Sequence, residues 1–207
     1  SDSLLGLQIK ADLFALTGNY EAAIQALEAA ISHFSLDSDL NAQRAAIDLH
    51  FGNLDGVKRY LGGSDYGRAS TPLKYLVAGD YFFLEGDFSN SEKSYRQALA
   101  IERTKVEALT RLAKINRAYG NSLESASLLR DALRLDPTNY LARAQKAELQ
   151  LENSEYEKAI KMFEVLLSEK PDDLLTLNAL AEAYLAEKRI KDALKSIRTA
   201  GLVEPSS

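Results

Sequence analysis

The fold is decided by residues 106–139, which read VEALTRLAKINRAYGNSLESASLLRDALRLDPTN. Apolar residues recur at steps of three and four in both halves of this stretch, which is the pattern of amphipathic helices. Gly120 separates the halves, and glycine readily adopts the positive φ that ends a helix. Pro137 follows the second half and cannot continue a helix. The stretch therefore predicts a helix, a tight turn and a second helix.

The same pattern repeats along the chain with a period of 34 residues. Glycine occupies the turn at four places, which are Gly18, Gly52, Gly86 and Gly120. Ser154 and Lys188 take the next two places, and proline keeps the same interval at 137, 171 and 205. We therefore predict one array over residues 1–207, with repeats of approximately 4–37, 38–71, 72–105, 106–139, 140–173 and 174–207.

Residue size follows this period as well. One position of each predicted first helix is small, namely Ala11, Ala45, Gly79, Ala113, Ala147 and Ala181. One position of each second helix is small or β-branched, namely Ala23, Val57, Ser91, Ser125, Ala159 and Ala193. Four residues later a bulky side chain follows, at Leu27, Leu61, Tyr95, Leu129, Phe163 and Ile197. Small residues let a partner helix approach closely. These positions are therefore expected to form a core shared by stacked hairpins.

The pattern resembles the tetratricopeptide repeat (TPR) over essentially the whole chain. Its best copies are Gly18-Asn19-Tyr20-Glu21-Ala22-Ala23 with Leu27 and Ala30, and Gly86-Asp87-Phe88 with Tyr95 and Ala98. The tryptophan or large residue near the start of the family's repeat is often replaced, as at Asn41 and Arg143. The resemblance implies an all-α fold, a right-handed α-solenoid of about six 34-residue helix-turn-helix repeats and twelve helices. A pentatricopeptide repeat, which binds RNA, has a similar pattern, but a pI near 5.2 argues against it.

The second repeat departs most from this pattern. Its second helix meets Gly62-Gly63, and each glycine costs about 1 kcal/mol in a helix interior. We therefore predict a short helix followed by a loop, which ends at the helix-start signal Ser70-Thr71-Pro72. Two interpretations remain open, a benign irregularity and a contact loop or flexible joint.

Composition limits the classes of function. The chain carries 25 Lys and Arg against 30 Asp and Glu, a net charge of −5, so we expect neither nucleic-acid binding nor direct membrane insertion. There is no cysteine, and the two histidines, His33 and His50, lack metal-ligand spacing, so we expect no metal and no cofactor. The paired acids Asp172 and Asp173 fall at a helix start, where the helix dipole favours negative charge. We predict a protein that is not an enzyme.

The resemblance implies that the first helices line a concave groove that receives a partner. The family's inward positions select a partner-binding set of Leu5, Gln8, Asp12, Ala42, Ala46, Leu49, Leu73, Leu76, Asp80, Phe83, Thr110, Lys114, Arg117, Ala144 and Glu148. The last two repeats add Leu141, Leu151, Leu175, Asn178, Glu182 and Leu185. Lys114 and Arg117 form a small basic patch in the fourth repeat. Asp80 is suited to pair with a Lys or Arg of the partner. Exposed apolar patches usually receive a ligand, so we expect a protein or peptide partner with apolar anchors and a basic residue. For each charged residue, the alternative is a solvated helix face.

Some TPR proteins bind the acidic C-terminal tails of chaperones through a carboxylate clamp. That clamp needs Lys and Asn in one repeat, Asn in the next, and two basic residues in a third. The corresponding positions here carry Gln8 and Asp12, then Gln43, then Leu73 and Val77. The sequence therefore argues against a chaperone tail as the partner.

We predict a protein–protein interaction scaffold that is a fragment of a larger protein, because the chain opens at Ser1 without methionine and ends without a polar capping helix. An apolar face on the last repeat predicts weak self-association, through Leu185, Ile190, Leu194 and Ile197. Two alternatives stay open, a structural segment of a longer repeat protein and the regulatory domain of an enzyme whose catalytic part is absent. Degenerate repeats suit a bacterial assembly protein, and a soluble location in cytoplasm or periplasm is compatible with the composition.

Overall fold

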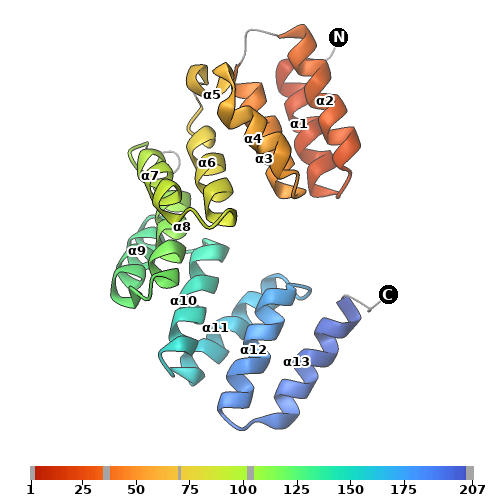
Figure 1. Cartoon of the computed structure of the whole chain (residues 1–207). Coiled ribbons are helices and arrows are strands. Elements are labelled where there is room, and N and C mark those ends of the chain that lie inside the picture. Colours follow the sequence, from red (N-terminus) through yellow and green to blue (C-terminus); the bar gives the residue numbers. More distant parts are fainter. Residues whose placement is uncertain (1–2, 35–37, 70, 102–104, 204–207) are drawn as a thin grey trace. The chain divides into compact units, whose positions relative to one another are not determined.

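The computed structural model describes residues 3–34, 38–69, 71–101 and 105–203. Within these ranges the chain forms thirteen helices and no strand, which confirms the predicted all-α class (Figure 1). The chain divides into two compact units, residues 1–108 and 109–207. Each unit is described by itself.

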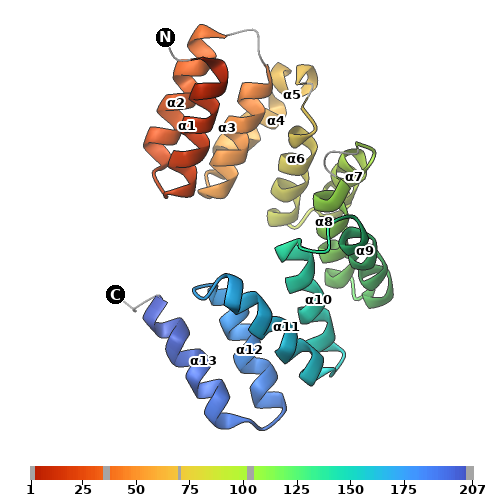
Figure 2. The ribbon, with the colours of Figure 1, turned by 180° about the vertical axis from the view of Figure 1, so that it is seen from behind.

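The first unit is built from antiparallel helix pairs. Its helices are α1 (Leu4–Leu16), α2 (Tyr20–His33), α3 (Ser38–His50), α4 (Leu54–Gly62), α5 (Ser64–Arg68), α6 (Leu73–Leu84) and α7 (Phe88–Leu99). The pairs α1 with α2 and α6 with α7 make close contacts, and α2 and α6 each also pack against α3. Figures 1 and 2 both show α1 and α2 side by side.

The second unit repeats this arrangement. Its helices are α9 (Ser122–Leu135), α10 (Tyr140–Glu152), α11 (Tyr156–Glu169), α12 (Leu174–Ala186) and α13 (Ile190–Val203). Helix α8 (Lys105–Ala118) begins before the boundary between the units and continues into the second. The second helix of each hairpin starts 34 residues after the previous one, at Tyr20, Leu54, Phe88, Ser122, Tyr156 and Ile190.

The turn inside every hairpin has one geometry. The N–H of Gly18 donates to the carbonyl of Ala15 at 3.1 Å, and the N–H of Asn19 donates to that of Phe14 at 2.8 Å. This pair of bonds is the Schellman motif, which needs one residue with positive φ. Gly18, Gly52, Gly86 and Gly120 have φ between 76° and 78°, which confirms the prediction from the sequence. Ser154 and Lys188 adopt φ of 62° and 60° and close the same turn without glycine.

The residue after the turn also begins the next helix. Asn19 is the N-cap of α2, where its side chain accepts from the N–H of Ala22 at 3.1 Å. Asp87 caps α7 in the same way, by accepting from the N–H of Asn90 at 3.1 Å. One residue therefore ends the first helix and starts the second, which leaves no spare length in the hairpin loop.

The core of each unit lies between neighbouring hairpins. In the first unit, Leu7, Leu27 and Leu40 join α1, α2 and α3 in one buried cluster. The predicted small positions are buried throughout. At Gly79 the space is filled by Tyr95, since an added Cβ would lie 2.2 Å from the ring carbon Cε1. The periodic small residues thus set how closely the paired helices approach.

The predicted loop after α4 is wrong in one respect. Helix α4 ends at Gly62 as expected, but residues 64–68 form the short helix α5, so the described residues form thirteen helices where twelve were predicted. Three hydrogen bonds hold α5 and the residue after it in place. The Nδ2 of Asn41 donates to Oδ2 of Asp65 at 3.0 Å, and the Nζ of Lys74 donates to the carbonyls of Tyr66 and Ala69 at 3.3 and 2.6 Å.

The structure describes two of the three residues that form the predicted start signal of α6, Thr71 and Pro72. Ser70, the first residue of the predicted signal, lies outside the described residues. The Oγ1 of Thr71 accepts from the N–H of Leu73 at 3.3 Å, so Thr71 contributes to the start of α6. Pro72 occupies the N-cap position, where the missing N–H costs no helical hydrogen bond.

Candidate functional site

The second unit carries a groove of about 630 Å³ along the first helices of its hairpins. The groove is formed by α8, α10 and α12 together with the turn between α10 and α11. Its lining residues are Arg117, Glu148, Leu151, Glu152, Ser154, Tyr156, Leu175, Asn178, Ala179, Glu182 and Ala186. We call this set the inner groove.

Helical spacing explains why these residues meet. On α12, residues 175, 178, 179, 182 and 186 follow steps of three and four, so they share one face. The start of α12 is fixed by Asp173, whose side chain accepts from the N–H of Leu175 at 3.2 Å. The start of α10 is fixed by Asn139, which accepts from the N–H of Ala142 at 3.0 Å. The two caps hold both walls of the inner groove in register.

The inner groove is acidic. It holds the carboxylates of Glu148, Glu152 and Glu182 but only one guanidinium, that of Arg117. Arg117 forms an ion pair with Glu148, and its Nε lies 3.8 Å from a carboxylate oxygen of Glu152. The positive charge predicted at Arg117 is therefore offset by its neighbours, and the groove retains a negative excess near Glu182.

The inner groove also presents apolar surface. Leu175, the second residue of α12, is 78% exposed and lies beside polar residues. Leu151 on α10 is half-buried and lines the same groove. An exposed leucine within a concave acidic surface is suited to an amphipathic partner that carries positive charge.

The structure places the other predicted residues of the second unit in different environments. Ala144 is half-buried against the core cluster of α10, α11 and α12. Lys114 is exposed on α8 and does not line the inner groove. Thr110 is only 3% exposed, so it offers no surface to a partner, contrary to the sequence interpretation. Sequence reasoning missed Glu152 and Ser154, which enter the groove from the end of α10 and the following turn.

The predicted residues of the first unit also divide by burial. Leu5 is exposed, and Gln8 is half-buried. Asp12 is exposed and accepts a bond from Nε2 of Gln43 at 2.8 Å. Ala42 and Leu76 are 0% and 6% exposed, so the interpretation of these two as surface contacts is corrected. Their positions face the packed interior because neighbouring helices cover that side of α3 and α6.

Five predicted residues of α3 and α6 already have contacts within the first unit. Oδ1 of Asp80 accepts from the hydroxyl of Tyr95 at 2.6 Å. The ring of Phe83 lies 5.3 Å from that of Phe88, measured between centroids. Leu49 and Leu73 are half-buried, like Ala46, and pack against the core cluster of α3, α4 and α6. A role of these residues in partner binding remains a prediction.

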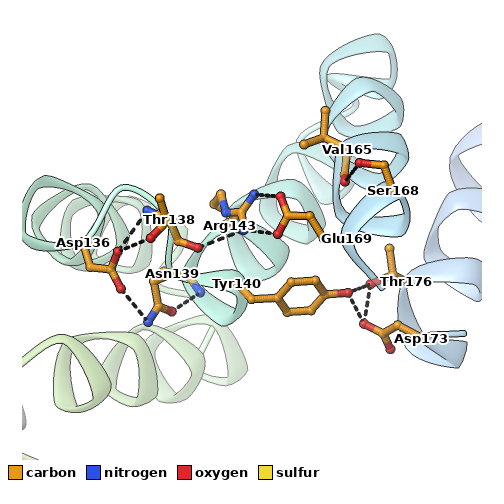
Figure 3. A network of polar contacts seen from close by, with 11 residues as sticks. Asp136, Thr138, Asn139, Tyr140, Arg143, Val165, Ser168, Glu169, Asp173 and Thr176 are labelled. Atoms are coloured by element: carbon orange, nitrogen blue, oxygen red, sulfur yellow. Dashed lines mark hydrogen bonds and ion pairs between the residues drawn. The ribbon is translucent and has the colours of Figure 1, made fainter. Parts of the chain in front are cut away.

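A polar network fixes α10 against α11 and α12 (Figure 3). Arg143 donates to both carboxylate oxygens of Glu169, each at 2.6 Å. These bonds hold the pKa of Glu169 below its ordinary value. The hydroxyl of Tyr140 donates to Oδ2 of Asp173 at 2.5 Å; burial first, and then this bond, raise the pKa of Tyr140. The network therefore supports the walls of the inner groove.

The helices at the two ends of the chain expose apolar faces. On α1 the exposed residues are Leu5, Ile9, Leu13 and Leu16, and on α13 they include Ile190, Leu194 and Ile197. Leu13 is 58% exposed, whereas the residues at its position in the later repeats are all buried, namely Ile47, Tyr81, Ile115, Leu149 and Ala183. Ile197 is 48% exposed, whereas Phe163 at its position in the preceding repeat is 1% exposed. The end helices thus display faces that internal helices cover.

Neither a metal-ligand cluster nor a membrane-spanning helix occurs in the described part of the chain. There, no group of three or more His, Cys, Asp or Glu side chains is arranged to hold a metal ion. None of the described helices has the length and apolar character needed to cross a membrane.

Comparison with known proteins gives relatives of the same type. The chain is 26% identical over 118 residues to tetratricopeptide repeat protein 21A of Mus musculus, an alignment that takes in 57% of this chain and 9% of the mouse protein. Its fold is similar to that of one chain in the crystal structure of the APC/C hetero-tetramer Cut9-Hcn1, with a TM-score of 0.81, 16% identity, and coverage of 99% of this chain and 40% of that chain. The chain therefore spans less than half the length of both proteins.

A second similar structure is that of YrrB, described as a TPR protein with an unusual peptide-binding site. It has a TM-score of 0.55 and 17% identity, with coverage of 87% of this chain and 93% of that one. Family models of the tetratricopeptide repeat match residues 116–177 and 151–207, and a further model of this repeat matches residues 6–32. Because these matches cover more than half of the chain and lie in both units, the chain belongs to the tetratricopeptide repeat family.

Proposed function

We propose that this interaction scaffold binds a peptide or helix in its inner groove, and that the bound segment carries apolar anchors and a basic residue. The observation that carries the proposal is the joint presence of Leu175, which is 78% exposed, and an excess of carboxylates in a groove of about 630 Å³. The TPR fold supports protein binding in general. YrrB, a TPR protein with a peptide-binding site, supports a peptide as the class of ligand.

The bound segment is proposed to place an apolar side chain over Leu175 and its positive charge near Glu182. Arg117 already pairs with Glu148, so Glu182 is the carboxylate best placed to receive a basic residue. An apolar anchor in the middle of an interface carries about 2 kcal/mol or more, and a charge at its edge acts mainly on the association rate.

Fluorescence anisotropy with a labelled amphipathic peptide tests this proposal. The probe has leucines on one helical face and lysines on the other. Leu175→Asp and Glu182→Lys are each expected to weaken binding at least about tenfold. Leu123→Asp is the matched control for Leu175→Asp, and Glu187→Lys is the matched control for Glu182→Lys. Leu123 is 90% exposed on α9, Glu187 is exposed after α12, and both lie outside the inner groove. Equal effects of Leu123→Asp and Leu175→Asp would contradict the proposal.

The first unit is proposed to offer a second contact surface through its exposed and half-buried predicted residues, which are Leu5, Gln8, Asp12, Ala46, Leu49, Leu73, Asp80 and Phe83. Phe83→Ala tests this surface. If Phe83 contacts a partner, the variant lowers affinity, whereas a residue that only packs against Phe88 lowers the melting temperature and leaves affinity unchanged.

The exposed end helices favour a second proposal, which is weak head-to-tail association of two copies through α13 of one and α1 of the other. Sedimentation of Leu13→Glu and Ile197→Glu variants, alone and mixed, tests it. Each variant alone is expected to be monomeric, while the mixture forms a dimer through its two intact faces. A mixture that stays monomeric at concentrations where the wild type associates would contradict this arrangement.

A further inference from the structure

A second groove lies on the opposite side of α10, between α9 and α10. It has a volume of about 480 Å³, which is within the range of about 300–1,000 Å³ typical of ligand pockets. We call it the outer groove. On α10 it uses Lys146 and Leu149, whereas the inner groove uses Glu148 and Leu151. Residues two apart on a helix point about 200° from one another, so α10 separates the two grooves.

The outer groove has an apolar floor. Leu129 on α9 and Leu149 on α10 form it and are 1% and 4% exposed. Leu133, one turn after Leu129, is half-buried and leads from the floor towards the surface. An apolar side chain that entered here would contact leucines from both helices.

The edge of the outer groove is basic. Arg130 and Arg134 from α9 and Lys146 from α10 line it, against a single acidic residue, Glu155. Arg134 lies 3.4 Å from Asp131, and Glu155 lies 3.2 Å from Lys158. Across the described residues, neither Arg130 nor Lys146 forms an ion pair. The groove therefore has two uncompensated positive charges, opposite in sign to the excess in the inner groove.

A buried acceptor lies in the same groove. The side-chain oxygen Oε1 of Gln150 is buried and accepts no hydrogen bond from any described residue. An unpaired buried polar atom is destabilising, and a donor from a docked chain would recover part of this lost free energy. A backbone N–H of an extended segment is such a donor.

We infer that the outer groove binds a short acidic segment of a partner protein. Its apolar residue enters between Leu133 and Leu149, its carboxylates face Arg130 and Lys146, and a backbone N–H donates to Gln150. The inference does not depend on the inner groove, which selects a basic segment. A single helix, α10, would then hold two segments of opposite charge on its two sides.

Binding of two labelled probe peptides to the full chain tests the inference. The acidic probe has a leucine pair among Asp, Glu and Ser, and the basic probe has Lys in place of the acids. The double variant Arg130→Glu, Lys146→Glu is expected to weaken binding of the acidic probe at least about tenfold and to leave binding of the basic probe unchanged. The control is Lys161→Glu combined with Lys195→Glu, which makes the same change in net charge at exposed positions of α11 and α13.

Methyl NMR spectra locate the bound probe. The acidic probe is expected to shift the methyl signals of Leu133 and Leu149 and to leave those of Leu151 and Leu175 in place. Three results would overturn the inference. They are no binding of the acidic probe to the wild type, an equal loss of affinity for the acidic probe in the control variant, and shifts of methyl signals confined to Leu151 and Leu175. Preference for a single-stranded RNA oligonucleotide over the acidic peptide, lost in the Arg130 and Lys146 variant, would assign the groove to another class of ligand and also overturn it.

Discussion

Replacing Lys188 with glycine is expected to stabilise the protein, although it removes a whole side chain. Lys188 occupies the turn between α12 and α13 with a φ of 60°, in the left-handed region. Its N–H and that of Arg189 close the turn by donating to Leu185 and Tyr184 at 3.0 and 2.8 Å. These bonds use only the backbone, so glycine retains them.

The magnitude follows from two opposing terms. A residue with a Cβ pays about 1–2 kcal/mol in the left-handed region, and glycine avoids this. Glycine also gives the unfolded chain more freedom, which lowers stability by about 0.5–1 kcal/mol. The net gain in the free energy of unfolding is therefore about 0.5–1 kcal/mol. Ser154→Gly should gain less, because the Oγ of Ser154 also accepts from the hydroxyl of Tyr156 at 3.2 Å.

Urea denaturation followed by circular dichroism measures this gain. Lys188→Ala is the matched control, because it removes the charge and the long side chain but keeps the Cβ. Gly120→Ala is the reverse experiment, since an added Cβ there has no atom within 4 Å and any loss reports on the backbone alone. If Lys188→Gly is less stable than both the wild type and Lys188→Ala, the left-handed turn is not strained and the reasoning fails.

Four further results are expected. Gly79→Ala should lower the free energy of unfolding, measured by urea denaturation, by about 1–3 kcal/mol, because the new Cβ overlaps the Tyr95 ring. Adding Tyr95→Leu should restore part of this free energy. Glu155→Asp should raise thermal stability by about 0.5–1 kcal/mol, since the side chain of Glu155 makes no cap bond to α11; an unchanged melting temperature would count against it. Glu169→Gln should lower stability at neutral pH, and its difference from the wild type should vanish as pH falls through the folded pKa of Glu169, which Arg143 depresses; a constant difference in urea titrations would refute this. Backbone amides of α5, which has no buried residue, should exchange faster than those of α7, and equal protection would show that α5 is as stable as the longer helix.

The hairpin register could be predicted because it depends on local chemistry. A residue with positive φ marks each turn, and the next residue also caps the following helix at Asn19, Asn53 and Asp87, so the signal lies in neighbouring positions. At Ser154 and Lys188 the period alone located the turn, since the glycine that would signal it is absent.

Features that depend on contacts between distant residues could not be predicted. The bond from Asn41 to Asp65 holds α5, and the two residues are 24 positions apart. The ion pair of Arg117 with Glu148 changes the charge of the inner groove and joins residues 31 positions apart. Periodicity assigns each residue to a face of its own helix, but it does not give the neighbour on the next helix. The outer groove was missed for the same reason.

The short reach of the helix contacts affects how the protein forms during synthesis. Helix α1 packs against α2, and α12 against α13, and the other principal contacts between described helices also join the same or the adjacent hairpin. A ribosome that adds about 5–20 residues per second releases one 34-residue hairpin every few seconds, while helices form in about a microsecond. Each new hairpin therefore meets a neighbour that is already folded. A pause in translation between hairpins leaves only folded pairs outside the ribosome, whereas a pause inside a hairpin leaves one helix with its apolar face open to chaperones and to other nascent chains.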